Sequence, residues 1–128
     1  MAVAVVRLGS PRTAGEGLRI GTVRRPPRGV PKADYARRNF YDVWLPELAP
    51  SAELVRRALA MRTAAQWRTF ERRYRSEMRE AHAARTLALL AALSHGANFS
   101  VGCYCEEESR CHRSLLKSLL AEHGARIK

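Results

Sequence analysis

The stretch Phe99-Ser-Val-Gly-Cys-Tyr-Cys-Glu-Glu-Glu-Ser-Arg-Cys-His-Arg-Ser-Leu-Leu-Lys-Ser-Leu-Leu120 decides the fold that this chain is expected to adopt. Its first half alternates residue types with a period of two, which predicts a strand with one face formed by Phe99, Val101, Cys103 and Cys105. Its second half has leucines at helical spacing, and Ser109 is the predicted N-cap of that helix. A strand followed by a loop and a helix is typical of an α/β protein.

The predicted turn between this strand and this helix favours an anion. Its first helical turn, expected at residues 110–113, would offer free backbone amides and the positive end of the helix dipole. Ser109, Arg110 and Arg113 are therefore the predicted anion-binding residues of this turn. Cys105, the last thiol of the strand, is expected at the mouth of the same pocket.

Two short apolar runs near the N-terminus, residues 3–8 and 18–23, predict two further strands on either side of a loop rich in turn formers. The next segment contains consecutive prolines, which exclude both a helix and a central strand. We expect it to be an extended loop at a strand end that helps to bind the anion through Arg24, Arg25 and Arg28.

Helical patterns fill the middle of the chain. Ser51 is expected to cap a helix over residues 52–62, and Thr63 with Gln66 forms a capping-box pattern for the next one. An aromatic stripe in that second helix, Trp67, Phe70 and Tyr74, is interpreted as core. The apolar residues 85–95 either continue this helix or follow a break near residues 80–84, and residues 124–128 are expected to fray.

These patterns together predict a single compact α/β domain over residues 1–128, with a small sheet of about three to four strands packed by helices. The odd number of cysteines and the short N-terminal apolar run indicate neither a disulfide framework nor a signal peptide. No segment approaches the ~20 apolar residues of a membrane helix. We expect a bacterial, cytoplasmic protein with reduced thiols and no membrane association.

The formal net charge of +11 on 128 residues favours an anionic partner, either a small molecule such as a phosphate compound or a nucleic acid. Twenty of the 23 basic residues are arginine, a skew that biased codon composition also produces. One predicted helix face carries Arg68, Arg72, Arg75 and Arg79. This line is either a phosphate track or a solvated face with Glu71 paired to Arg75.

The cysteines permit a zinc site in composition, since Cys103, Cys105, Cys111 and His112 are all zinc-binding residue types. The predicted geometry argues against it, because alternate strand residues stand about 6.5 to 7 Å apart, whereas thiolates on one zinc ion lie under ~4 Å apart. Cys111 and His112 would also diverge by about 100° on a helix. A distorted site stays open, but no metal and no cofactor are predicted.

Nucleophilic catalysis is the second interpretation of the cysteines. The helix N-terminus and Arg110 or Arg113 would favour a Cys105 thiolate, and His112 would serve as base or acid. The spacing differs from that of thiol phosphatases, which place an arginine six positions after the cysteine, where this chain has Ser109 or Cys111. In a third interpretation, the buried thiols and His112 simply fill the contact between helix and sheet.

Four blocks of the chain resemble the YeaO-like family of small bacterial proteins, a domain of unknown function. They are residues 19–30, residues 41–51, residues 67–77 and the cysteine strand that leads to Cys111-His-Arg113. The resemblance covers most of the chain and implies a compact α/β domain with helices around a small sheet. It implies no established activity.

Overall fold

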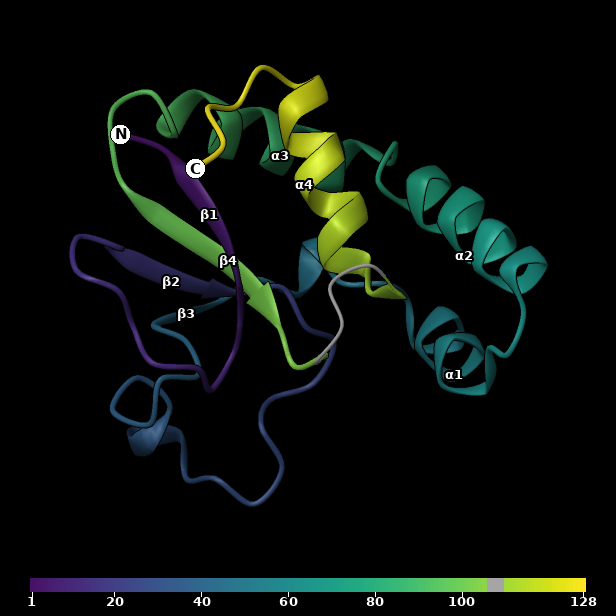
Figure 1. Cartoon of the computed structure of the whole chain (residues 1–128), viewed down its shortest axis with the longest axis horizontal. Helices are drawn as coiled ribbons and strands as arrows, with labels where there is room; N and C mark the ends of the chain where they lie inside the picture. Colours follow the sequence, from purple (N-terminus) through teal and green to yellow (C-terminus); the bar gives the residue numbers. More distant parts are fainter. Residues whose placement is uncertain (106–109) are drawn as a thin grey trace.

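Four parallel strands form one sheet in the order β1-β4-β2-β3 (Figure 1). They are β1 (Val3–Arg7), β2 (Leu18–Gly21), β3 (Val43–Trp44) and β4 (Phe99–Cys103). The computed structural model describes residues 1–105 and 110–128. In the central register, Val101 of β4 lies between Val5 of β1 and Ile20 of β2. The predicted α/β class and the size of the sheet are confirmed.

The helices cover one face of this sheet. α1 (Ala52–Ala60), α2 (Ala64–Glu77) and α3 (Ala81–Leu93) lie between β3 and β4 in the chain, and α4 (His112–Glu122) follows β4. Figure 1 shows α3 and α4 beside the sheet, with α2 and α1 farther out. Two short 3-10 helices, η1 (Lys32–Asp34) and η2 (Pro46–Leu48), lie in the connections.

Local signals start α1 and α2 where the sequence predicts them. The Ser51 hydroxyl accepts from the Leu54 amide at 3.3 Å, and both hydrogen bonds of the Thr63–Gln66 capping box are present. The chain then breaks between Glu77 and Ala81, with Glu80 as the N-cap of α3. A break therefore separates two helices, as one of the two alternatives predicts, but it lies at residues 78–80, and residues 81–84 already belong to α3.

The core lies between the helices and one face of the sheet. Phe70 and Tyr74 are buried in it, so the core interpretation of the aromatic stripe is confirmed for these two rings. Residues that alternate along the strands face the core, and the largest buried groups include Val3, Leu48, Leu54, Leu87, Val101, Leu116 and Leu120.

Both boundaries of the predicted strand-to-helix turn are corrected by the structure. β4 ends at Cys103 rather than Cys105, because β1 and β2 have already ended there and offer no further pairing partner. α4 begins at His112 with Cys111 as its N-cap, so Arg110 precedes the helix. The predicted N-cap Ser109 lies outside the described residues.

The C-terminal residues, expected to fray, are instead ordered beside β1. Val3 donates its amide to the Arg126 carbonyl at 2.9 Å, and the Lys128 amide donates to the Val3 carbonyl at 2.9 Å. Ile127 thereby forms a short parallel bridge with Val3. An edge strand presents unpaired backbone groups, and this tail satisfies some of those of β1.

Candidate functional site

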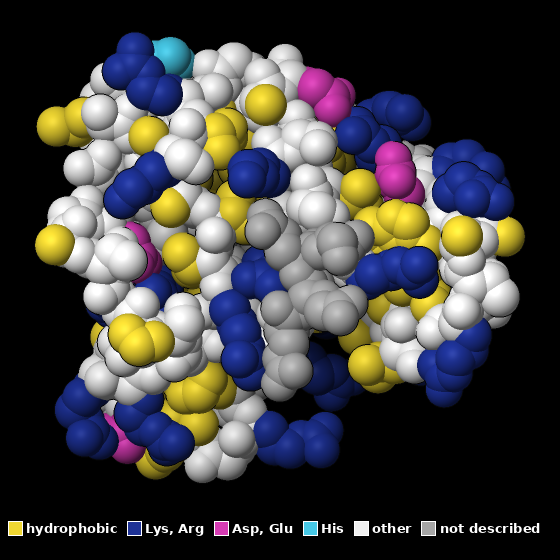
Figure 2. All heavy atoms as spheres, in the orientation of Figure 1, with side chains coloured by type: hydrophobic (Ala, Val, Ile, Leu, Met, Phe, Trp, Pro, Cys, Tyr) yellow, Lys and Arg dark blue, Asp and Glu magenta, His cyan; other side chains and the backbone are white. Residues whose placement is uncertain are grey.

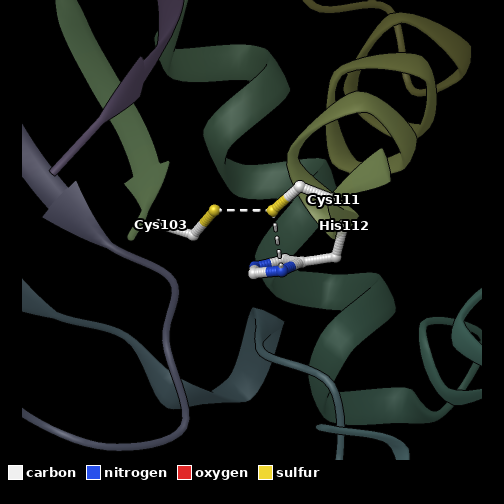
Figure 3. Close-up of side chains that lie close together, drawn as sticks. All are labelled: Cys103, Cys111 and His112. Atoms are coloured by element: carbon white, nitrogen blue, oxygen red, sulfur yellow. Dashed lines mark hydrogen bonds between the residues drawn. The ribbon is translucent and has the colours of Figure 1, made fainter. Parts of the chain in front are cut away.

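The cysteines converge where the carboxyl end of β4 meets the amino end of α4. Cys103 is the last residue of β4, while Cys111 and His112 open α4 (Figure 3). All three side chains are more than nine-tenths buried. The carboxyl edge of a parallel sheet is where α/β proteins usually bind ligands.

His112 is fixed by contacts on both ring nitrogens. Its Nε2 lies 2.8 Å from the carbonyl oxygen of Thr22, which only accepts, so Nε2 carries the hydrogen. Its Nδ1 then has a lone pair, and this atom lies 3.7 Å from the Cys111 sulfur. Burial lowers the pKa of His112 to about 4. The ring is therefore neutral at pH 7 and faces the thiols with an acceptor.

The three sulfurs form one cluster. Cys103 Sγ lies 2.7 Å from Cys111 Sγ (Figure 3). Cys105 is exposed, and its interactions with the thiols of Cys103 and Cys111 lower the pKa of its own thiol to about 3. The hydrogen bond to Cys105 and burial raise the pKa of Cys103. The cluster therefore holds one negative charge, on its exposed sulfur.

The pKa of Cys111 is raised to about 11. The hydrogen bond with Cys103 lowers it, but the hydrogen bond to Cys105 and burial outweigh that effect. Cys111 therefore stays a thiol at neutral pH. The sequence predicts the direction of the Cys105 shift, but the main cause is a pair of neighbouring thiols rather than a helix terminus that includes Arg110.

Two hydrogen bonds hold the Cys105 segment in place. Buried Arg113 donates from Nη2 to the Cys105 carbonyl at 2.7 Å, and its positive charge further lowers the pKa of the Cys105 thiol. The Tyr104 hydroxyl donates to the Arg25 carbonyl at 3.0 Å. The thiol segment is thereby tied to α4 on one side and to the loop of residues 24–28 on the other.

The predicted anion-binding arginines divide into two groups. Arg24 is half-buried and donates to the carbonyls of Pro46, Ala49 and Pro50 at 3.0 to 3.2 Å, so its guanidinium joins the loop to the η2 segment. It borders a cleft of about 490 Å³ that is also lined by Glu47, Glu77 and Glu80. Arg25, Arg28 and Arg110 are exposed, and no described acidic residue pairs with them.

The same cluster also contains residues of the types that bind metal ions. The donor atoms of Cys103, Cys111 and His112 lie within 4.8 Å of one another, so the predicted divergence of these side chains is wrong. The side chains of Cys111 and His112 converge because Cys111 is the N-cap, with an extended backbone, rather than a residue within the helix. Two thiolates on one zinc ion lie ~3.8 Å apart. The 2.7 Å between the sulfurs is shorter, which favours thiol chemistry over a shared metal.

A second buried polar cluster was not predicted from the sequence. Arg19, fully buried, donates from Nε to Glu16 at 2.8 Å and from Nη1 to the carbonyls of Ser10 and Asn39. Ser100 of β4 donates its hydroxyl to Glu16 at 2.6 Å. The sequence signal for this buried pair is an arginine inside an apolar run, with an acidic residue three positions earlier.

Arginines are spread over the surface (Figure 2). On α2, Arg68 and Arg72 are exposed, whereas Arg75 lies 3.0 Å from Glu122 and 3.7 Å from Glu71. Arg79 is also exposed but lies beyond the end of α2 at Glu77, so the predicted line of four arginines on one helix is wrong. The predicted pair of Glu71 with Arg75 is confirmed. No helix in the described parts of the chain is long and apolar enough to cross a membrane.

Comparison with known proteins gives one match. A family model, DUF488-N3a, described as "Active DUF488-N3 subclade", matches residues 3–124, a span that includes every residue of the sulfur cluster. No curated protein and no solved structure matches the chain.

Proposed function

We propose that this chain, which belongs to the DUF488-N3 family, is a thiol-dependent enzyme. Its substrate is a small anionic molecule, and its nucleophile is Cys105. The resemblance to YeaO-like proteins is confirmed by this membership, since YeaO is a DUF488 protein. The family description contains the word active and names no reaction. The observation that carries the proposal is that Cys105 alone of the three cysteines is exposed, while the two buried thiols and Arg113 lower its pKa.

A thiolate is the reactive form of cysteine, and an exposed thiolate stabilised by its surroundings is the usual nucleophile of thiol enzymes. The lowered pKa of Cys105 makes it a thiolate at pH 7, so no separate base is needed to deprotonate it. His112 is buried and neutral, and its Nδ1 faces Cys111. In this proposal His112 is a positioning residue that orients a donor thiol, and it exchanges no proton with the substrate.

The preference for an anion rests on the arginines around Cys105. Arg113 contacts the Cys105 carbonyl, and Arg110 lies just before α4. The Tyr104 hydrogen bond brings the backbone of exposed Arg25 next to the thiol segment, and exposed Arg28 follows in the same loop. Exposed arginines beside a reactive thiolate attract phosphate or carboxylate groups to it.

Alkylation with matched reagents tests both parts of this proposal. Rates at Cys105 are measured with iodoacetate, which is anionic, and iodoacetamide, which is neutral, in the folded protein and in the denaturant-unfolded chain. We expect the iodoacetate to iodoacetamide ratio to be higher in the folded protein, to fall in an Arg25→Gln/Arg28→Gln variant, and to decrease when inorganic phosphate competes. An Arg57→Gln variant, with its charge on the distant helix α1, is the control.

Equal ratios in the folded and unfolded chains would remove the anion site. A Cys105 whose alkylation rate falls below pH 8 as steeply as that of an unfolded thiol would remove the nucleophile.

Nucleic-acid binding is the second candidate, favoured by the net charge of +11 and by exposed Arg68 and Arg72 on α2. Neutralised phosphates release counterions, so such binding must weaken steeply as salt rises. Titration of a duplex and a single-stranded oligonucleotide at low and physiological salt tests it. An Arg68→Gln/Arg72→Gln variant should then lower the salt slope, and no binding at low salt would exclude this candidate.

A further inference from the structure

We propose that the sulfur cluster reduces hydroperoxides, with Cys105 as the sulfur that is first oxidised and the Cys103–Cys111 pair as the dithiol that takes up the oxidation. This activity uses the same Cys105 thiolate as the proposed function, but it also requires the two buried thiols to react. The proposed attack on an anionic substrate does not require the buried thiols of Cys103 and Cys111 to react.

The position of the buried pair carries the inference. Their sulfurs are 2.7 Å apart, which is nearer to the ~2.05 Å of a disulfide than to the ~3.8 Å between two thiolates on one zinc ion. Both residues are at most 3 % exposed, so an external oxidant reaches them through Cys105. Reactive redox cysteines are exposed and lie near a resolving thiol. Cys105 is exposed, follows Cys103 by two residues, and has its pKa lowered by the thiols of Cys103 and Cys111.

The first step is attack of the Cys105 thiolate on the outer oxygen of the peroxide. The O–O bond breaks, Cys105 becomes a sulfenic acid, and the departing alkoxide takes the proton of the Cys111 thiol to leave as an alcohol, or as water when the peroxide is hydrogen peroxide. Cys111 is then a thiolate that can attack the sulfur that has just been oxidised.

The second step joins the Cys111 sulfur to Cys105 and expels hydroxide, which takes the proton of Cys103 and leaves as water. In the third step the Cys103 thiolate attacks the Cys111 sulfur, forms the Cys103–Cys111 disulfide and releases Cys105 as a thiolate. One peroxide and two thiols have become one alcohol, one water and one disulfide. A dithiol reductant returns the pair to thiols.

Disulfide mapping after oxidation tests this sequence. Reduced wild-type protein receives one equivalent of hydrogen peroxide, and peptide mass spectrometry locates the products. We expect the Cys103–Cys111 disulfide with Cys105 still reduced. Cys105→Ser should slow its formation at least about 100-fold, because buried thiols contain little thiolate.

Two further variants trap the intermediates. Cys111→Ser should stop at a Cys105 sulfenic acid that a cyclic 1,3-dione captures, and Cys103→Ser should stop at the Cys105–Cys111 disulfide. Circular dichroism shows whether each variant is folded. The disulfide mapping in the wild-type protein tests the proposal even if neither variant folds.

Three results would overturn the proposal. They are direct conversion of wild-type Cys105 to sulfinic acid, a Cys103–Cys111 disulfide that forms equally fast in Cys105→Ser, and purified protein with one zinc ion that must be removed before peroxide reacts. Fast, anion-selective alkylation of Cys105 without any disulfide would remove the peroxide activity alone. Disulfide formation at a Cys105 that is indifferent to anions would remove the anionic substrate alone.

Discussion

Strand β4 carries two buried polar clusters that differ in what they leave available. Near its start, Ser100 joins Glu16 and Arg19 in a network whose hydrogen bonds are all made inside the protein. At its end, Cys103 joins a cluster whose negative charge lies on exposed Cys105. The first has its charges paired and inaccessible to a ligand, so it serves the fold. The second extends to the surface, so it is the place where we propose that chemistry occurs.

Substitutions in the two clusters should also differ in how much folding free energy they cost. Removing one partner of a buried ion pair leaves an uncompensated charge, which costs about 3 to 5 kcal/mol. Thiols are weak hydrogen-bond donors, so losing one costs the fold little. Substitutions should therefore separate stability, which depends on the Glu16 network, from reactivity, which depends on the sulfur cluster.

The largest expected effect comes from Arg19→Leu, which leaves the Glu16 carboxylate buried without its cation. We expect the free energy of unfolding to fall by about 3 to 5 kcal/mol in urea denaturation. Arg12→Leu is the matched control, because Arg12 also lies 2.8 Å from a carboxylate, that of Asp42, but both side chains are about a quarter exposed. That pair should contribute no more than about 1 kcal/mol. Equal losses in the two variants would contradict the contrast.

The next effect is on the reactivity of Cys105. A thiol with the ordinary pKa of ~8.5 is only about 3 % thiolate at pH 7, so complete ionisation raises the alkylation rate up to ~30-fold. Because the Cys105 pKa is about 3, its rate should stay level from pH 8 down to pH 5. Mass spectrometry of alkylated peptides measures it. Cys111→Ala removes one donor and should restore part of the pH dependence, whereas a steep decline in the wild-type protein would show an ordinary thiol.

A smaller effect is expected in the pH dependence of stability. The pKa of Cys105 is lower in the folded than in the unfolded chain, so its stabilisation is present above about pH 9 and decreases as pH falls toward about 3. Between pH 9 and pH 5 the wild-type protein should lose more unfolding free energy than Cys105→Ser. Parallel stability curves for the two proteins would mean that the thiolate is not stabilised by folding.

The smallest effect is expected from Ser100→Ala. Its hydroxyl donates one hydrogen bond to Glu16, whose remaining partners, Arg19 and the Thr13 amide, stay in place. Loss of one such bond should cost about 1 kcal/mol in thermal or urea unfolding, with Cys105 alkylation unchanged. A change in alkylation rate would show that the two clusters of β4 are coupled.

Local patterns in the sequence are sufficient to predict much of this fold. The Ser51 cap, the Thr63–Gln66 capping box and the core face of α2 depend on residues three or four positions apart, so the sequence itself contains both partners. Strand alternation likewise predicts that Cys103 faces inward. The chain order of strand, loop and helix also leads to a candidate site at the end of that strand.

Only the tertiary structure decides how the sulfurs meet. The end of β4 depends on where β1 and β2 stop, and the bend that follows brings Cys105 back to Cys103 and Cys111. His112 is oriented by the Thr22 carbonyl, which lies 90 positions earlier in the chain. Ser100 and Glu16 are similarly distant, with 84 positions between them. Such contacts arise from strand register and helix packing, and no periodicity within one segment contains that information.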